Sequence, residues 1–237
     1  MSPAAVAAVA PSTEPAGRGG AVAGPVLHMV ASGGLYGIER MLLGLLPSLR
    51  ELGCDAVLGS LGPPGGPSGA LGAALESLGV PVHYPATRGR FSLRGLARID
   101  ATIRQTRPAV VHLHGYKAII LAGPLSLARR IPTVATFHTE VLKTPGFAAH
   151  KKLEMQVVRR LRGMTAVSEP IRQELEVRGV RPERIRVVPN GIVDPVRAFG
   201  PTGVRAGAAA ARPTRVINGR VRGGTDLAPP VHSVAER

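Results

Sequence analysis

Short apolar runs alternate with helical patterns along most of the chain, and this alternation leaves few folds open to it. Runs such as VLHMV and TVATF are mostly apolar and rich in β-branched residues, which is typical of strands buried on both faces. The predicted strands are Val26–Val30, Cys54–Leu61, Val80–Tyr84, Pro108–Leu113, Pro132–Phe137, Met164–Val167 and Ile185–Val188. The predicted helices are 38–49, Ala70–Leu78, Ser92–Gln105, Lys117–Arg129, Phe147–Leu161 and Glu169–Arg178. The pattern predicts a doubly wound parallel α/β sheet, a Rossmann-like fold.

Composition divides the chain into one folded domain and two tails. Residues 1–24 are mainly Ala, Pro and Gly, so we predict a disordered tail there. A domain is predicted over 25–194, and an apolar content of 44% in 237 residues is enough for its core. Residues 195–237 show no apolar period of 2 or 3.6 residues, which predicts an irregular basic tail.

Charge and cysteine content limit the partners and the compartment. The net charge of +15 favours anionic partners. However, a sizeable share of the excess follows Val196, and the sequence has neither an RNA-binding aromatic signature nor a Cys/His finger, so we do not expect nucleic acid. The single cysteine, Cys54, excludes an internal disulfide and fits a reducing compartment. No apolar run approaches the ~20 residues of a membrane span, so we expect a cytoplasmic protein.

The first predicted strand runs through Ala-Ser-Gly-Gly into a helix. Gly33 and Gly34 allow a tight turn and leave no side chain between the backbone N–H groups and a bound anion. The following helix supplies a positive dipole end. One interpretation is a pocket for phosphate or a polar substrate, and the other is an ordinary strand-to-helix turn.

Histidines follow the fourth and fifth predicted strands. In a sheet of order 3-2-1-4-5, the fourth strand lies beside the first, so His114 and Gly115 are expected to face the glycine pair across the crevice. His112 and His114 lie two residues apart and point to one face of their strand, where such a pair could bind zinc. No third ligand lies at a supporting spacing in the sequence, so we predict no metal site.

His138 follows the fifth strand at the same edge of the sheet. An imidazole there can donate a hydrogen bond to a hydroxyl or phosphate oxygen, or transfer a proton near neutral pH. Glu140 could orient it. The alternative is a histidine that only caps the following turn.

Two further candidates lie near the end of the predicted domain. Ser168 precedes a helix with Pro170 in its first turn, so we expect its side chain to satisfy the free N–H groups of that helix. Asn190 and Gly191 form a turn after the last strand. The candidate substrate-binding residues are therefore Gly33, Gly34, His114, Gly115, Glu140, Ser168 and Asn190.

The predicted helix Phe147–Leu161 is strongly basic. Its expected apolar side holds Leu153, Val157, Val158 and Leu161. Its cations include Lys151, Lys152, Arg159 and Arg160. Such a helix can lie on an anionic membrane, which would place the protein at the inner face of the membrane. A solvated basic face is the alternative interpretation.

Five segments together, and in this order, resemble the amino-terminal domain of the retaining GT-B glycosyltransferases of family 4. They are GGLYGIERMLLGLLPSLRELG, PAVVHLHG, IPTVATFHTE, MTAVSEPIRQEL and RIRVVPNGI. The resemblance covers about Pro25 to Asp194. It implies that this domain holds a sugar acceptor, while a second Rossmann-like domain binds the nucleotide-sugar donor.

The resemblance also implies roles for individual residues. Gly33 and Gly34 would approach the donor diphosphate or the acceptor, and His138 would be the family histidine near the transferred sugar. Ser168 and Asn190 match scaffold positions. The family uses no obligatory metal and no cofactor besides the donor substrate.

The sequence departs from the family after Asp194. Only the 43 residues of 195–237 follow, and Glu236 is their only glutamate, so the E-x7-E pair of the donor domain is absent from them. We therefore expect the acceptor half of a retaining glycosyltransferase, cut short, inactive alone and dependent on a separate donor-binding domain. The alternative is a non-catalytic module that binds an acceptor or an anionic membrane surface.

Overall fold

The computed structural model describes residues 22–85, 92–138 and 148–190, and the statements below concern these residues. The chain divides into two compact units, Met1–Val193 and Asp194–Arg237. All of the described residues belong to the first unit. The predicted tail 195–237 and most of the predicted tail 1–24 lie outside the described residues.

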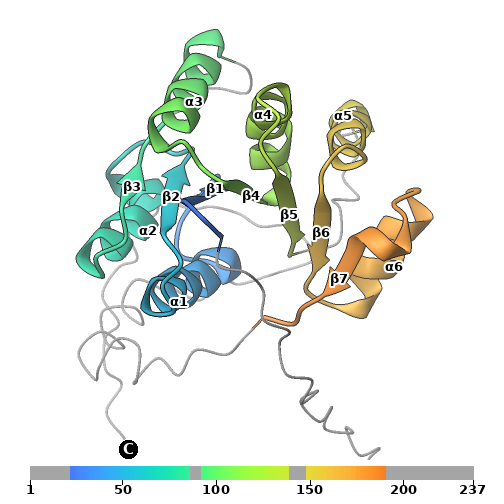
Figure 1. Cartoon of the computed structure of the whole chain (residues 1–237), viewed down its shortest axis with the longest axis horizontal. Helices are drawn as coiled ribbons and strands as arrows, with labels where there is room; N and C mark the ends of the chain where they lie inside the picture. Colours follow the sequence, from blue (N-terminus) through green and yellow to red (C-terminus); the bar gives the residue numbers. More distant parts are fainter. Residues whose placement is uncertain (1–21, 86–91, 139–147, 191–237) are drawn as a thin grey trace, which may run out of the picture. The chain divides into compact units, whose positions relative to one another are not determined.

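A parallel sheet of seven strands forms the centre of the fold (Figure 1). The strands are β1 Val26–Val30, β2 Ala56–Ser60, β3 Val82–His83, β4 Val110–His114, β5 Thr133–Phe137, β6 Gly163–Ala166 and β7 Ile185–Val187. Their order is β3-β2-β1-β4-β5-β6-β7, so β1 and β4 are neighbours, as predicted. All strand pairs are parallel, and Val30 at the end of β1 lies opposite His114 at the end of β4.

Helices cover both faces of this sheet. They are α1 Gly37–Glu51, α2 Gly66–Ser77, α3 Leu93–Thr106, α4 Gly115–Ala128, α5 Ala148–Val158 and α6 Glu169–Val177. Helices α3, α4 and α5 lie side by side over one face, and α1 and α2 pack together on the other (Figure 1). This is the predicted doubly wound arrangement. No helix in the described part of the chain is long and apolar enough to cross a membrane.

The alternation of side chains along the strands separates an aliphatic core from a polar site. Leu27 and Met29 of β1, with Val111 and Leu113 of β4, belong to the large core under α3, α4 and α5. Successive side chains of a strand point to opposite faces. The histidines that alternate with these residues therefore point to the face that carries α1 and α2.

The predicted boundaries that differ from the structure include the start of α2 and the ends of β3. Helix α2 begins within the Gly/Pro-rich segment 62–69, at Gly66 rather than at the predicted Ala70. A proline in the first helical turn costs no hydrogen bond, because the N–H groups there have no partner within the helix, so Pro67 starts α2 rather than preventing it. The third strand is also shorter than expected and keeps only Val82 and His83.

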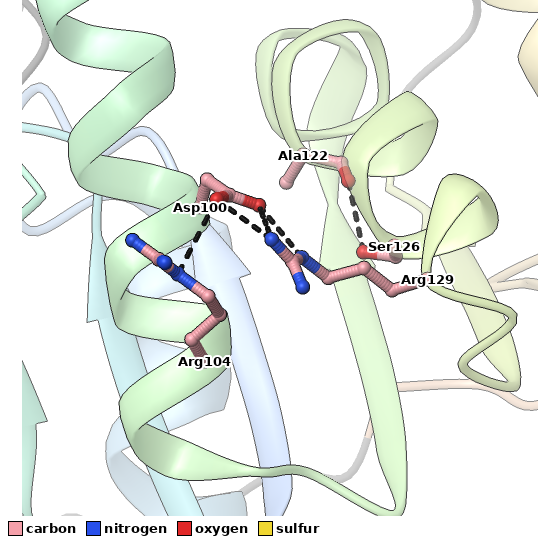
Figure 2. Close-up of polar contacts among 5 residues, drawn as sticks. All are labelled: Asp100, Arg104, Ala122, Ser126 and Arg129. Atoms are coloured by element: carbon pink, nitrogen blue, oxygen red, sulfur yellow. Dashed lines mark hydrogen bonds and ion pairs between the residues drawn. The ribbon is translucent and has the colours of Figure 1, made fainter.

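An ion pair joins α3 to the end of α4 (Figure 2). The Nε and Nη2 atoms of Arg129 donate to the two carboxylate oxygens of Asp100 at 2.7 and 2.8 Å. Arg104, one turn along α3, lies 3.5 Å from the same carboxylate. The hydrogen bonds from Arg129 are the main reason that the pKa of Asp100 lies below its usual value. Arg129 therefore fixes the end of α4 against α3 while Asp100 is ionised.

Candidate histidine site at the carboxyl edge of the sheet

Four histidines lie together, three from the neighbouring strands β1 and β4 and one that directly follows β5. His28 in β1 lies opposite His112 in β4, and His114 follows on the same face of β4. The Nδ1 atom of His28 lies 3.1 Å from Nε2 of His114, whose own Nδ1 lies 3.3 Å from Nε2 of His138. The imidazoles of His28, His114 and His138 thus form a continuous chain, with His138 at its outer end.

His112 lies beside this chain and has a different partner. Its Nε2 atom lies 2.7 Å from the hydroxyl oxygen of Thr136 in β5. Its ring lies 4.2 Å from that of His114 and 4.9 Å from that of His28, centroid to centroid. The parallel pairing of β1, β4 and β5 thus brings together residues that are far apart in sequence.

Burial keeps these imidazoles uncharged at neutral pH. It lowers the pKa of His28 to about 3, and the pKa values of His112 and His138 to about 4. Burial also holds the pKa of His114 well below its ordinary value, with smaller contributions from the three neighbouring histidines. At pH 7 each ring therefore has one N–H group and one lone pair, and acts as a hydrogen-bonding group rather than a cation.

The hydrogen-bond chain couples the tautomers of its three members. If His28 donates through Nδ1, then His114 and His138 also carry their protons on Nδ1, and if the direction reverses, all three carry them on Nε2. The two outer atoms, Nε2 of His28 and Nδ1 of His138, are buried and have no hydrogen-bond partner among the residues that the structure describes. Each end of the histidine chain therefore has a ring nitrogen that can hydrogen-bond to another group.

The turn after β1 lies at the same edge as His114. Neither Gly33 nor Gly34 has a positive φ, so the expected tight turn does not depend on the backbone freedom of glycine. A Cβ atom on Gly34 would lie 2.9 Å from the Tyr36 ring, whereas one on Gly33 would meet no atom within 4 Å. Ser32 holds the turn by donating its hydroxyl to the Gly34 carbonyl oxygen at 2.9 Å. Gly33 therefore leaves open space beside the edge of the sheet.

Gly115 is needed for its backbone conformation. Its φ of +77° lies in the left-handed region, and it connects β4 directly to α4. The helix begins two residues earlier than predicted, and His114 is its N-cap residue. This sharp junction keeps His114 at the point where the strand ends.

The remaining candidates do not join the histidines. Ser168 is the N-cap residue of α6, but its side chain makes no capping hydrogen bond, so the expected cap is wrong. Pro170, at the second helical position, has no N–H group to donate to it. Asn190 is exposed after β7, and Glu140 lies outside the described residues. No hydrogen bond found among the described residues links Ser168 or Asn190 to the histidines.

Helix α5 differs from the expected membrane-binding helix. Leu153 is 41% exposed, while the other predicted apolar residues, Val157, Val158 and Leu161, are buried in the core. Lys152, Arg159 and Arg160 are exposed, and Lys151 also lies in α5. Arg159 donates to the carbonyl oxygen of Arg178 and Arg160 to that of Gln156. The apolar side of α5 is therefore used for folding.

Sequence reasoning missed His28. It searched for a third ligand near His112 and His114 in sequence, whereas His28 lies in another strand, opposite His112. The signal was present, because the predicted strand order already placed β1 beside β4.

A shallow depression lined by Ala101, Arg104, Gln105 and Arg107 lies at the carboxyl end of α3, on the opposite edge of the sheet from the histidines, and is not part of this site.

Comparison with known proteins identifies both a family and a fold. Residues 36–194 match the family described as Glycosyltransferase Family 4. No curated protein matches the chain. Similar solved structures include Anabaena Alr3699/HepE in complex with UDP-glucose, with a TM-score of 0.60 and 20% identity over 71% of this chain and 44% of that one.

The similar structures also include two from other organisms. A glycosyltransferase from Rickettsia africae ESF-5 gives a TM-score of 0.56 and 19% identity over 78% of this chain and 48% of that one. The UDP-GlcNAc 2-epimerase from Neisseria meningitidis, bound to UDP-GlcNAc, gives a TM-score of 0.55 and 13% identity over 77% of this chain and 52% of that one. The chain thus spans about half the length of these structures. At these identities the likeness is one of fold, and it confirms the predicted Rossmann-like lobe.

Proposed function

The chain belongs to glycosyltransferase family 4, and we propose from this that its described part is the acceptor-side lobe of a retaining glycosyltransferase. Such an enzyme transfers a sugar from a nucleotide-sugar donor to an acceptor. The observation that carries the proposal is the arrangement of His114, His138 and the open Gly33 turn at the carboxyl edge of neighbouring strands. Doubly wound sheets bind their ligands at this edge.

His138 is the proposed catalytic residue. With a pKa of about 4 it is neutral at pH 7, so it would act by hydrogen bonding to a hydroxyl of the transferred sugar or to a phosphate oxygen. Its Nδ1 atom has no hydrogen-bond partner within 22–85, 92–138 and 148–190, and its Nε2 atom faces His114. We propose that Nδ1 is the atom that meets the substrate.

The other half of the reaction is assigned to a second lobe. The similar structures are about twice as long as the matched part of this chain, and one of them contains UDP-glucose. We propose that a donor-binding lobe, within a longer protein or on a separate chain, closes over the carboxyl edge and supplies the phosphate-binding groups. The described lobe alone would then transfer no sugar, and transfer would have no obligatory requirement for metal or cofactor.

A complementation assay tests this function. The purified chain is incubated with a panel of radiolabelled nucleotide sugars, with and without an added family 4 donor-binding domain. We expect sugar transfer or donor hydrolysis only when both parts are present, and its loss in His138→Ala but not in Lys152→Ala, which changes an exposed cation of α5. Transfer by the chain alone, or an unchanged rate in His138→Ala, would contradict the proposal.

A membrane-binding module is the second candidate, supported by exposed cations within and directly after α5. Lys152, Arg159 and Arg160 could hold the lobe on an anionic membrane by electrostatic attraction, without insertion, because the apolar side of α5 is buried. Flotation with vesicles containing anionic lipid tests this. Neutralising the three cations should abolish flotation, and unchanged flotation would exclude α5 as the contact surface.

A further inference from the structure

Three histidines of the cluster have the composition and spacing of a metal site. His28, His112 and His114 each offer one ring nitrogen, and these three atoms lie within 4.8 Å of one another. We propose that they bind a divalent transition-metal ion of the zinc class. This inference concerns metal occupancy alone and stands apart from the proposed sugar transfer.

The distance between the ligand nitrogens of His28 and His114 fits one shared ion. Two imidazole nitrogens that bind the same zinc ion at about 2.0–2.1 Å lie about 3.3 Å apart at the tetrahedral angle. The Nδ1 atom of His28 and the Nε2 atom of His114 are 3.1 Å apart. An ion can therefore take the place of the proton between these two atoms after shifts of a few tenths of an ångström, and the ring that carried this proton then holds it on its other nitrogen.

The third ligand is positioned by the neighbouring strand. The Nε2 atom of His112 is engaged with the hydroxyl of Thr136 at 2.7 Å, which leaves Nδ1 as the coordinating atom. Histidine ligands commonly bond an outer-shell oxygen through their second nitrogen, which fixes the ring. His112 is only partly buried, unlike His28 and His114, so an ion would enter from its side.

The donor set decides the class of ion. Imidazole nitrogens suit zinc, cobalt, nickel and copper, whereas magnesium and calcium require oxygen ligands. Protons compete little with such an ion at neutral pH, because burial keeps the rings neutral. Three neutral ligands also leave the fourth position of a tetrahedral ion to a water molecule or another exchangeable ligand.

Metal binding would also determine which nitrogen of His138, at the outer end of the histidine chain, carries the proton. With its Nε2 bound to the ion, His114 must carry its proton on Nδ1, which faces the Nε2 atom of His138. His138 then accepts this hydrogen bond and keeps its own proton on Nδ1. The ion would thus fix the direction of the hydrogen bond between His114 and His138, while His28, bound through Nδ1, would carry its proton on Nε2.

Metal titration tests the site without any activity assay. The untagged chain is stripped with a chelator and titrated with Co²⁺, followed by visible absorption, and with Zn²⁺ in competition with a chromophoric chelator. We expect one equivalent to bind, with the strong visible bands of four-coordinate cobalt. His28→Leu and His112→Leu should each weaken zinc binding by at least about tenfold, a loss that even outer-shell changes can cause.

Two control variants distinguish this site from others. His83→Ala removes a histidine of β3 outside the cluster, and Cys54→Ser removes the only thiol, so both should bind zinc as the original chain does. X-ray absorption at the zinc edge of the unmodified chain gives a readout that does not depend on how the variants fold, and we expect three imidazole ligands. Absence of a saturable equivalent, undiminished binding in the two leucine variants, or fewer than two imidazoles around zinc would overturn the proposal.

Discussion

The Nδ1 atom of His28 lies 3.1 Å from the Nε2 atom of His114, although 86 residues separate the two in sequence. The contact exists because the polypeptide first forms β2 and β3 on one side of β1 and then returns to place β4 on the other side of it. Both rings are almost fully buried, and the pKa of each is lowered by this burial. Two uncharged imidazoles therefore share one proton at the junction of the two halves of the sheet.

The first prediction is that the metal-free chain loses stability as the pH falls from about 6.5 toward 4. Above pH 6.5, His28 is neutral in both the folded and the unfolded chain, so its titration does not change the free energy of unfolding. Below it, the unfolded chain takes up a proton that the native chain, with a His28 pKa of about 3, does not bind. At pH 5 this lowers the free energy of unfolding by about 2 kcal/mol for His28 alone.

Urea unfolding followed by far-ultraviolet circular dichroism, at pH 7.5 and pH 5 with chelator present, measures this loss. His28→Leu should show a smaller difference between the two pH values. Met29→Leu, which changes the next residue of β1 on the opposite face, should keep the original difference. Equal stability of the unmodified chain at both pH values would show that the histidines are not buried in neutral form.

The second prediction distinguishes the two glycines after β1. A Cβ atom on Gly33 meets nothing within 4 Å, so Gly33→Ala should change the free energy of unfolding by less than about 0.5 kcal/mol. If a ligand occupies the open space beside Gly33, the same methyl group should slow sugar transfer in the complemented enzyme at least about tenfold, equivalent to about 1.4 kcal/mol.

Gly37→Ala is the matched control for this experiment. Gly37 also has open space around it and lies at the start of α1, so the variant should retain both stability and transfer. Gly34→Ala should instead displace the Tyr36 ring, because its Cβ would lie 2.9 Å from that ring. Equal transfer rates in Gly33→Ala and Gly37→Ala would mean that no ligand approaches the turn.

The strand pattern predicted the sheet because each core strand is a short, nearly continuous apolar run. Val26–Val30 and Thr133–Phe137 need no side-chain detail to be recognised as buried strands. The order of the strands then followed from the general topology of such sheets. The pattern failed where a residue is compatible with two local structures, as at Pro67, which precedes the predicted start of the helix at Ala70 but lies in the first turn of α2.

The site was less predictable than the sheet. His114 ends β4 and His138 directly follows β5, so the order of the strands placed them at one edge from the sequence alone. His28 was missed because its neighbours are set by the register of β1 against β4, and no spacing along the chain contains that information. The open space beside Gly33 depends on side-chain positions that a sequence pattern does not specify.

The third prediction concerns the pair between Asp100 and Arg129. Because Arg129 reaches both carboxylate oxygens, Arg129→Lys should weaken the contact although the charge is kept. A double-mutant cycle with Asp100→Asn and Arg129→Met, measured by urea unfolding, should give a favourable coupling that decreases with added salt. The same cycle on Arg50 and Asp55, which make a single and more exposed contact, should give a smaller coupling. A larger coupling between Arg50 and Asp55 than between Asp100 and Arg129 would show that bidentate geometry contributes nothing here.

The fourth prediction is that Gly123→Ala destabilises the packing of α4 on α5. A Cβ atom at this position would lie 2.6 Å from the Cγ1 atom of Val157, whose χ1 angle is restricted in a helix. Overpacking of this kind costs about 1–3 kcal/mol, and the gain in helix propensity offsets up to about 1 kcal/mol, so we expect a net loss of about 1–2 kcal/mol in urea unfolding. Adding Val157→Ala should lower stability by much less in the Gly123→Ala chain than in the original chain, because the second change removes the clash. If the stability losses of the two substitutions were additive, α4 and α5 would have moved apart, and the Cβ atom added at position 123 would not clash with the Val157 side chain.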